Sequence, residues 1–139
     1  MEIAVGMSAT AETTVKHDNT ALAVGSGTLE VFATPMMISR MEQAAWRAVP
    51  PALEPGQSTV GIQMTVSHLD ATPLGMKVRA EANVIALEGR KITFAVRAFD
   101  EKGLIGDGRH ERFIVTDDRF MKKCTDKRKN GTEPDDEEE

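Results

Sequence analysis

The sequence lacks the features that mark several large classes of protein. Its single cysteine, Cys124, cannot form an internal disulfide, which excludes a disulfide scaffold and a cysteine-rich zinc module and favours a reducing, cytoplasmic location. No uninterrupted apolar run approaches the roughly 18 residues of a membrane span, so no membrane partner is expected. The start, Met1 to Met7, has no basic segment ahead of a long apolar stretch, and no secretory signal is therefore expected.

Charge of one sign is also scarce along most of the chain. The net charge of the 139 residues is −5, of which −3 belongs to residues 117–139, with six basic and nine acidic side chains. The nearly neutral body gives no electrostatic reason to bind nucleic acid. After residue 116, only Phe120, Met121 and Cys124 interrupt the polar residues, too little apolar surface to offset the entropy of ordering. The sequence thus predicts one domain, residues 1–116, and a charged, disordered tail, residues 117–139.

The clearest local pattern predicts a helix from Pro35 to about Val49. Thr34 followed by Pro35 is typical of a helix start, with Thr34 as the N-cap residue and proline at the first helical position. Pro50 and Pro51 end the helix, because a residue before proline avoids the α region. Apolar residues recur between these limits at roughly helical spacing, and they are Met36, Met37, Met41, Ala44, Ala45 and Ala48.

Strand patterns lie on both sides of this helix. An exposed strand is predicted at Ala11–Asp18, and four alternating segments follow the helix, at residues 58–69, 76–87, 92–99 and 104–115. The turns between them are short, so consecutive strands pair antiparallel. The expected fold is α+β, a long curved antiparallel sheet wrapped around one central helix. Self-association through an unpaired edge strand predicts a homodimer, with a dimer of dimers as the alternative.

Two of the three histidines lie in these strands. His68 has the same parity as Val60, Ile62, Met64 and Val66, which favours a buried, hydrogen-bonded core histidine and leaves a catalytic base as the alternative. His110 belongs to a polar patch, residues 108–112, which favours a ladder of charges on an edge strand. His17 lies in the weak N-terminal strand, and we expect no function for it.

Glu42 and Thr34 offer a carboxylate and a hydroxyl. Glu42 is at the margin of the apolar helix face, where a carboxylate is usually exposed, and if buried it needs a partner such as His68. Thr34 is a simple helix cap or, alternatively, part of a site where free N–H groups hold a substrate carbonyl. With His68 they form the residue set of acyl transfer or ester hydrolysis. Because about 12 Å of helix separates Thr34 from Glu42, His68 must bridge them or a second subunit must contribute.

Other common sites have no support in the sequence. No spacing of histidine, cysteine and acidic residues matches a zinc or iron site, and no metal is expected. Residues 25–27 (GSG) are not followed by the lysine and hydroxyl residue of a phosphate-binding loop. The Gly-x-Ser-x-Gly motif of many hydrolases is absent. The sequence predicts no cofactor.

Three segments resemble hotdog-fold acyl-CoA thioesterases and, more narrowly, the fluoroacetyl-CoA thioesterase-like subgroup. Residues 31–42 (VFATPMMISRME) resemble the entry to the central helix of that fold. Residues 53–73, which contain LEPG and GIQMTVSHLDATP, and residues 106–112 (GDGRHER) resemble two further blocks. The likeness covers roughly residues 10–116, and the joint spacing of the blocks is more specific than any one of them.

The resemblance implies an acyl-CoA thioester hydrolase that works as a homodimer on a small-molecule substrate. In that family, residues at the positions of Thr34, Glu42 and His68 form the catalytic set. The glycine matching Gly61 contacts the thioester end of the substrate, and the arginine matching Arg112 helps to hold it.

One departure from the family bears on the substrate. The fluoroacetyl-specific member has phenylalanines upstream of the helix that form a lid, and Gly25 and Thr28 stand at the matching positions here. A different short- or medium-chain acyl group is therefore expected. A non-catalytic acyl-CoA-binding or sensing module and a 3-hydroxyacyl-thioester dehydratase of the same fold are the alternatives. The sequence leaves open whether coenzyme A or an acyl carrier protein carries the acyl group. It also leaves open whether a covalent acyl-enzyme forms or water attacks directly.

Overall fold

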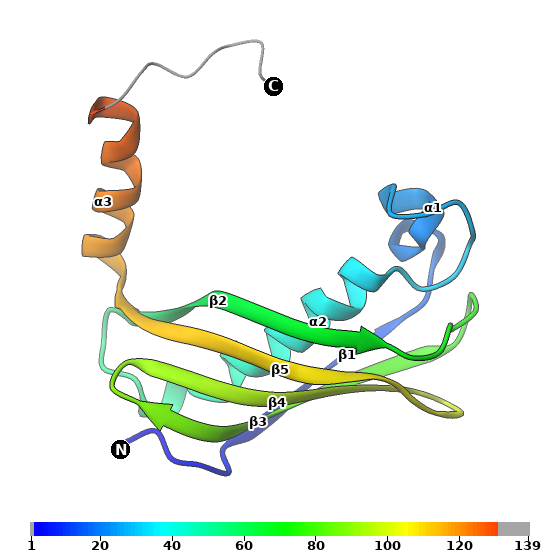
Figure 1. The fold of residues 1–139 in the computed structure, drawn as a ribbon, viewed down its shortest axis with the longest axis horizontal. Helices are drawn as coiled ribbons and strands as arrows, with labels where there is room; N and C mark the ends of the chain where they lie inside the picture. The colour runs from blue at the N-terminus through cyan, green and yellow to red at the C-terminus, as the bar shows by residue number, and fades with distance from the viewer. Residues whose placement is uncertain (1, 131–139) are drawn as a thin grey trace.

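The computed structural model describes residues 2–130 as a curved sheet wrapped around a helix (Figure 1). Five antiparallel strands form one sheet in the order β1-β3-β4-β5-β2, so β1 and β2 are its edges. The strands are β1 (Ser8–Thr14), β2 (Gln57–His68), β3 (Lys77–Glu88), β4 (Lys91–Asp100) and β5 (Gly103–Thr116). The helices are α1 (Ala21–Val24), α2 (Thr34–Arg47) and α3 (Asp117–Asn130), with short 3-10 turns η1 (His17–Asn19) and η2 (Pro50–Ala52). The predicted α+β fold is confirmed.

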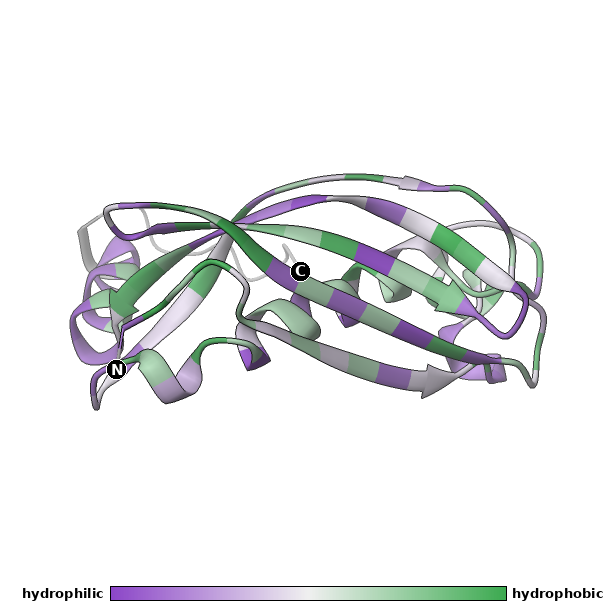
Figure 2. Cartoon of the chain, turned by 90° about the horizontal axis from the view of Figure 1, so that it is seen from below, coloured by the Kyte–Doolittle hydropathy of each residue, from purple (hydrophilic) through white to green (hydrophobic). Residues whose placement is uncertain are grey.

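The core lies between α2 and the concave face of the sheet. On α2 the predicted apolar stripe is buried, with Met37, Met41, Ala44 and Ala45 all 0% exposed. The facing side chains of β3 alternate with outward polar ones, as Figure 2 shows by the change of hydropathy along the strands. Two of the inward residues of β3, Ala80 and Ala82, are small, which lets α2 approach the sheet closely. Among the described residues, no helix is both long and apolar enough to cross a membrane.

A β-bulge in β2 changes the side-chain parity that the sequence predicts. The register with β5 shifts between Gly61 and Gln63, so Ile62 is the extra residue and is 52% exposed. Met64 and Val66, after the bulge, pack against the core, and His68 shares their parity. The prediction that Ile62 shares a face with these residues is wrong, because a bulge resets the alternation.

The predicted disorder after residue 116 is wrong for residues 117–130, which form α3. Asp117 and Asp118 occupy its first turn, where negative charge is favourable. The base of α3 is anchored by the hydroxyl of Ser58, which donates to the Asp117 carboxylate, and by the Asp117 N–H, which donates to the Gly56 carbonyl at 2.9 Å. The rest of the predicted tail, residues 131–139, lies outside the described residues.

The segment between β1 and α2 also differs from the prediction. The first strand ends at Thr14, not Asp18, and the chain then forms η1 and α1. Asn19 fixes this change of direction by donating to the Thr14 carbonyl at 3.0 Å, and the Thr20 hydroxyl caps α1 by accepting from the Ala23 N–H. We call residues 17–31 the α1 lobe. It projects from the end of the sheet opposite to α3 (Figure 1).

Strands β5 and β2 approach so closely that Gly108 tolerates no side chain. A Cβ there would lie 2.6 Å from the Cα of Val66 and closer still to the carbonyl oxygen of Thr65. We predict that Gly108→Ala lowers the melting temperature by roughly 3–15 °C, because the strands must separate to admit the methyl group. The neighbouring exposed Asp107→Ala is the control in the same thermal melt. Equal melting temperatures for the two variants would contradict this packing.

Candidate active site

The first residue of α2 and the last residue of β2 meet through their side chains. Thr34 Oγ1 lies 2.7 Å from His68 Nδ1, within hydrogen-bond distance. The N-cap residue of α2 is Ala33, so the prediction of Thr34 as a capping residue is wrong by one position, and its hydroxyl is directed to His68 instead. A hydroxyl paired with an imidazole is the arrangement of a nucleophile and its general base.

The surroundings of His68 disfavour the protonated imidazole. Burial is the main influence and lowers the pKa of His68, while the backbone and the carboxylate of Asp70 act in the opposite direction. Its Nε2 is buried and has no hydrogen-bond partner within residues 2–130. In the tautomer with the proton on Nε2, Nδ1 is free to accept the hydrogen of Thr34. A neutral imidazole in this position is ready to accept a proton.

A shallow hollow opens at this pair. Its walls come from the start of α2, the loop after β2 and the α1 lobe, and the lining residues include Ser26, Val31, Phe32, Thr34, His68 and Asp70. At the start of α2, Pro35 has no N–H, and the N–H groups of Met36 and Met37 both donate to the Ala33 carbonyl at 3.0 Å. The positive end of the helix dipole still favours a developing negative charge on oxygen. The hollow therefore combines an apolar wall, a hydroxyl, a base and the positive end of a helix.

A second cluster surrounds Gly61, next to the bulge in β2. A Cβ on Gly61 would lie 3.2 Å from Glu42 Oε2 and 3.4 Å from Arg112 Nη1, so the glycine leaves room for both charged groups. Arg112 is only 7% exposed. It donates from Nε to the Thr59 hydroxyl at 2.7 Å and from Nη2 to the Thr59 carbonyl at 2.9 Å. Burial lowers the pKa of Arg112, and the nearby Glu42 carboxylate opposes that shift.

His110 completes the second cluster, and the sequence did not predict this. Strand β5 lies between β4 and β2, so the predicted edge-strand ladder is wrong, and His110 is 1% exposed. Its Nδ1–H donates to the Gln63 carbonyl at 2.9 Å, and its Nε2 accepts from Arg112 Nη1 at 3.0 Å. Burial is the largest cause of a lowered pKa for His110. The neutral ring thus holds the guanidinium in place. The two-residue spacing of His110 and Arg112, on one strand face, was the available sequence signal.

One chain does not unite the five predicted site residues. Thr34 and His68 line one hollow, whereas Glu42 and Arg112 line another, farther along α2, with Gly61 beside them. The carboxylate that affects the pKa of His68 is that of Asp70. The Glu42 carboxylate instead affects the pKa values of His110 and Arg112. The suggested contact between Glu42 and His68 is therefore absent within the described chain.

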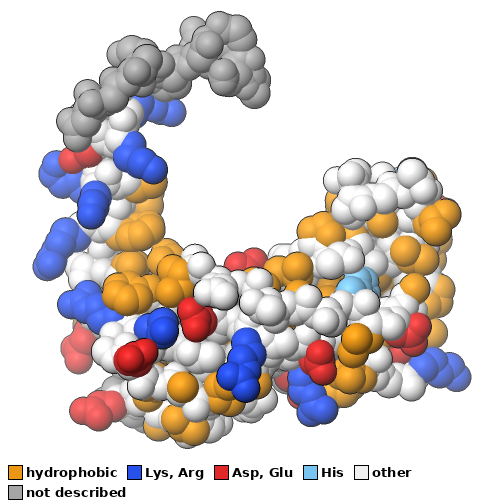
Figure 3. Space-filling model, in the orientation of Figure 1, with side chains coloured by type: hydrophobic (Ala, Val, Ile, Leu, Met, Phe, Trp, Pro, Cys, Tyr) orange, Lys and Arg blue, Asp and Glu red, His pale blue; other side chains and the backbone are white. Residues whose placement is uncertain are grey.

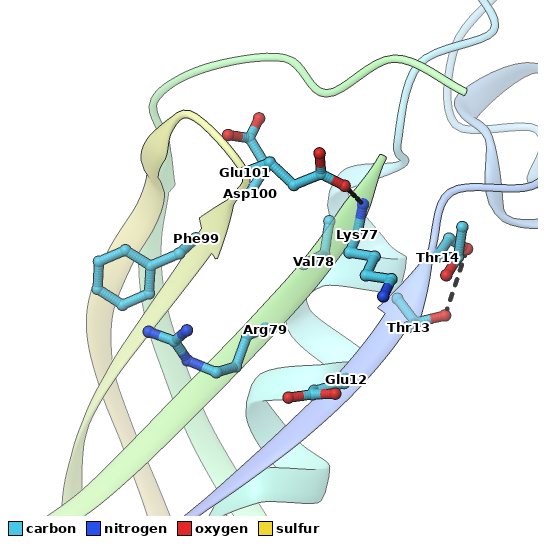
Figure 4. A pocket seen from close by; sticks show the side chains of 9 residues that line it. All are labelled: Glu12, Thr13, Thr14, Lys77, Val78, Arg79, Phe99, Asp100 and Glu101. Carbon is cyan, nitrogen blue, oxygen red and sulfur yellow. Dashed lines mark hydrogen bonds between the residues drawn. The ribbon is translucent and has the colours of Figure 1, made fainter. Parts of the chain in front are cut away.

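Another hollow lies over β1, β3 and the end of β4, and Figure 4 shows its side chains. Some of the charged groups in it contact the backbone or a ring. Glu101 accepts from the backbone N–H of Lys77 at 2.9 Å, and the Arg79 guanidinium lies 5.0 Å from the ring centre of Phe99. Neither a histidine nor a cysteine lines this hollow.

Comparisons with known proteins identify the family of the chain. The family of fluoroacetyl-CoA-specific thioesterases matches residues 15–118. A fluoroacetyl-CoA thioesterase of Streptantibioticus cattleyicolor is 41% identical over 98 residues, 70% of either chain. The chain belongs to this family. That membership confirms the resemblance and makes the protein a thioester hydrolase.

Solved structures confirm the hotdog fold. A structure of fluoroacetyl-CoA thioesterase has a TM-score of 0.85 and 34% identity, covering 91% of this chain and 98% of the other. A thioesterase superfamily member of Thermus thermophilus has a TM-score of 0.82 and 30% identity, covering 93% and 98%. A fluoroacetyl-CoA-specific thioesterase variant in complex with fluoroacetate and CoA has a TM-score of 0.79 and 35% identity, covering 85% and 99%.

The lowered pKa values of buried His110 and half-buried His68 have a measurable consequence. We predict that the imidazoles of His68 and His110 titrate below about 6.5, the ordinary histidine pKa, in NMR spectra of isotopically labelled protein. The unfolded chain then binds these protons more readily than the folded one. Stability from this source is complete above about pH 6.5 and is lost as the pH falls below it. Midpoints at or above the ordinary value for both rings would contradict the burial described here.

Proposed function

We propose that the protein is an acyl-CoA thioesterase that hydrolyses a short- or medium-chain acyl-CoA to the free acid and CoA. The observation that carries this proposal is the 2.7 Å contact between Thr34 Oγ1 and His68 Nδ1 at the start of α2. The names of the relatives support it, since they describe fluoroacetyl-CoA thioesterases and a complex with fluoroacetate and CoA. The reaction consumes only water. The proposed cellular location is the cytoplasm, because a single free cysteine fits a reducing compartment.

The α1 lobe supports an acyl group other than fluoroacetyl. Gly25 and Thr28, which replace the phenylalanines of the fluoroacetyl-specific enzyme, are exposed in the lobe above the hollow. Gly25 has a φ of 82°, a left-handed conformation that suits glycine and ends α1. A lobe without aromatic rings leaves space over Val31 and Phe32 for a longer acyl chain. Substrate selection would then follow chain length rather than fluorine.

We propose that the active site is completed by a second copy in a homodimer. Strand β2 is a sheet edge with unpaired backbone groups, which favours pairing with another β2. Thr34 and Glu42 are about 12 Å apart along α2. Along β2 the two clusters come in the reverse order, because Gly61 lies beside Glu42 and His68 contacts Thr34. A two-fold axis between the clusters would place Glu42 of the partner subunit beside the Thr34–His68 pair. Each dimer would then hold two equivalent sites.

The proposed chemistry needs few groups. The thioester carbonyl lies at the start of α2, where the positive end of the helix dipole favours the developing oxyanion, and Gly61 of the partner subunit approaches it together with Glu42 of the partner subunit. His68 removes a proton from the attacking oxygen, which belongs either to Thr34 or to a water held by Glu42. The carbon–sulfur bond breaks, and the CoA thiolate leaves with the proton that His68 returns. Attack by water gives the free acid directly. Attack by Thr34 gives an acyl ester on its oxygen, and a water activated by His68 then hydrolyses this ester to the free acid and restores the hydroxyl. Arg112, held by His110 and Thr59, supplies positive charge beside Glu42.

Single substitutions test the roles. We predict that His68→Ala and Glu42→Ala each reduce turnover at least about 10²-fold, because each removes a group that handles protons or positions the nucleophile. Free thiol is measured with a dye for a series of acyl-CoAs of increasing chain length. Asp107→Ala, a change on the outer sheet face, is the control. Full activity in both variants would remove these roles, and binding without thiol release by the wild type would contradict the thioesterase.

Mixed dimers test the shared site. We predict that Glu42→Ala and His68→Ala, each inactive alone, regain about a quarter of the wild-type activity per protomer when unfolded and refolded together. Half of the dimers are then mixed, and one of the two sites in each has an intact Thr34–His68 pair facing an intact Glu42. If mixing restores nothing while dimers still form, Glu42 does not act across the interface.

A further inference from the structure

Helix α3 has an apolar side that its own chain leaves uncovered. Phe120 and Met121 are 40% and 55% exposed, and Cys124 follows one turn later. Lys122 and Asp126 make an exposed ion pair at 3.0 Å, which contributes little to stability. Isolated helices of fewer than about 12–15 residues are marginal in water unless an apolar face is packed. A helix of this length is therefore expected to pack its apolar side against another protein surface.

The shape of the molecule supplies a place for that surface. In the space-filling view, α3 and the α1 lobe rise on the same side of the molecule and leave a hollow between them (Figure 3). Hydrophobic side chains gather on the side of α3 that faces this hollow and on the lobe opposite (Figure 3). The lobe contributes Leu22, Val24 and Leu29, which are 47%, 40% and 67% exposed.

The two walls stand at opposite ends of the same edge strand. Thr116, just before α3, pairs with Gln57 at the start of β2. At the other end of β2, the bridge between Val31 and Pro73 ties the lobe to the loop that follows His68. A two-fold axis through the middle of β2 exchanges these ends. It therefore sets α3 of one copy against the α1 lobe of the other.

We propose that α3 packs its apolar side against the α1 lobe of a second copy and so forms an outer wall of that copy's acyl-binding hollow. This rests on the homodimer of the proposed function. Charge agrees with this occupant, because the lobe and its neighbouring loop expose acidic Asp18, Glu30 and Asp70. Helix α3 is the more basic element, because residues 117–128 carry five basic side chains against the three acidic ones of Asp117, Asp118 and Asp126. The substrate would enter between the lobe of one copy and the helix of the other.

The single native thiol makes the contact testable in the full-length protein. Leu22→Cys adds a second thiol in the lobe, and a short bis-maleimide then joins Cys124 of one copy to the new thiol of the other. We expect a covalent dimer in high yield. Two controls are expected to give little covalent dimer, the wild type and Lys102→Cys. Lys102 is exposed in the turn between β4 and β5, at the lobe end of the sheet but outside the hollow. Adding Cys124→Ala to the Leu22→Cys variant is expected to abolish the product. Equal yields for Leu22→Cys and Lys102→Cys would overturn the proposal.

A second measurement uses the apolar side directly. Replacing Phe120 and Met121 together by aspartate is expected to raise the dimer dissociation constant at least about tenfold in analytical ultracentrifugation. Replacing both by leucine keeps the apolar surface and is expected to leave the constant within about twofold. The same constant for both double variants would overturn the contact.

The two proposals fail in different ways. A dimer that hydrolyses acyl-CoA without the specific cross-link would overturn the α3 contact and leave the thioesterase standing. A specific cross-link in a protein that releases no thiol from any acyl-CoA would do the reverse. A protein that is monomeric while it hydrolyses acyl-CoA would overturn the contact and the shared site together.

Discussion

The hydrogen bond between Thr34 and His68 depends on the packing of α2 within the sheet. It joins the first residue of the helix to the last residue of the edge strand, 34 residues later in the chain. The apolar stripe of α2 fixes the helix against β3 and β4, and the inward parity of β2 after its bulge turns the imidazole toward the helix. The contact between Thr34 and His68 is thus a consequence of core packing, so no separate loop is needed to hold the two side chains together.

The second cluster shows how the same scaffold carries charge into a largely apolar interior. Arg112 is buried, and its cost is met by hydrogen bonds to Thr59, by the neutral ring of His110 and by the nearby Glu42 carboxylate. Gly61 leaves space for the carboxylate and the guanidinium at the bulge. The two clusters lie apart in one chain, and a two-fold axis is the simplest operation that unites them.

Much of the fold could be predicted because its signals are local. The Thr34-Pro35 start and the prolines after Val49 defined α2 to within two residues, and alternation with short turns defined β2 to β5 equally well. The bulge at Ile62 could not be read from alternation, since an extra residue leaves no mark in the sequence. The helix α3 was missed because its anchors, Ser58 and Gly56, are distant in sequence.

The site was predicted in part for the same reason. Resemblance supplied Thr34, Glu42 and His68, but periodicity alone favoured other interpretations for each. Only the folded chain shows that the Thr34 hydroxyl meets His68, while Glu42 lies with Arg112. The inward position of His110 required knowledge of strand order, because an interior strand and an edge strand can carry the same pattern.

The most direct measurement of the central claim is a double-mutant cycle on the reactive pair. kcat/KM for the preferred acyl-CoA is measured for wild type, Thr34→Ala, His68→Ala and the double variant. If the hydroxyl and the imidazole act as one unit, the double variant is no slower than the slower single variant, because removing either partner already disables both. Losses that multiply in the double variant would mean that the two groups act independently, and would contradict the account.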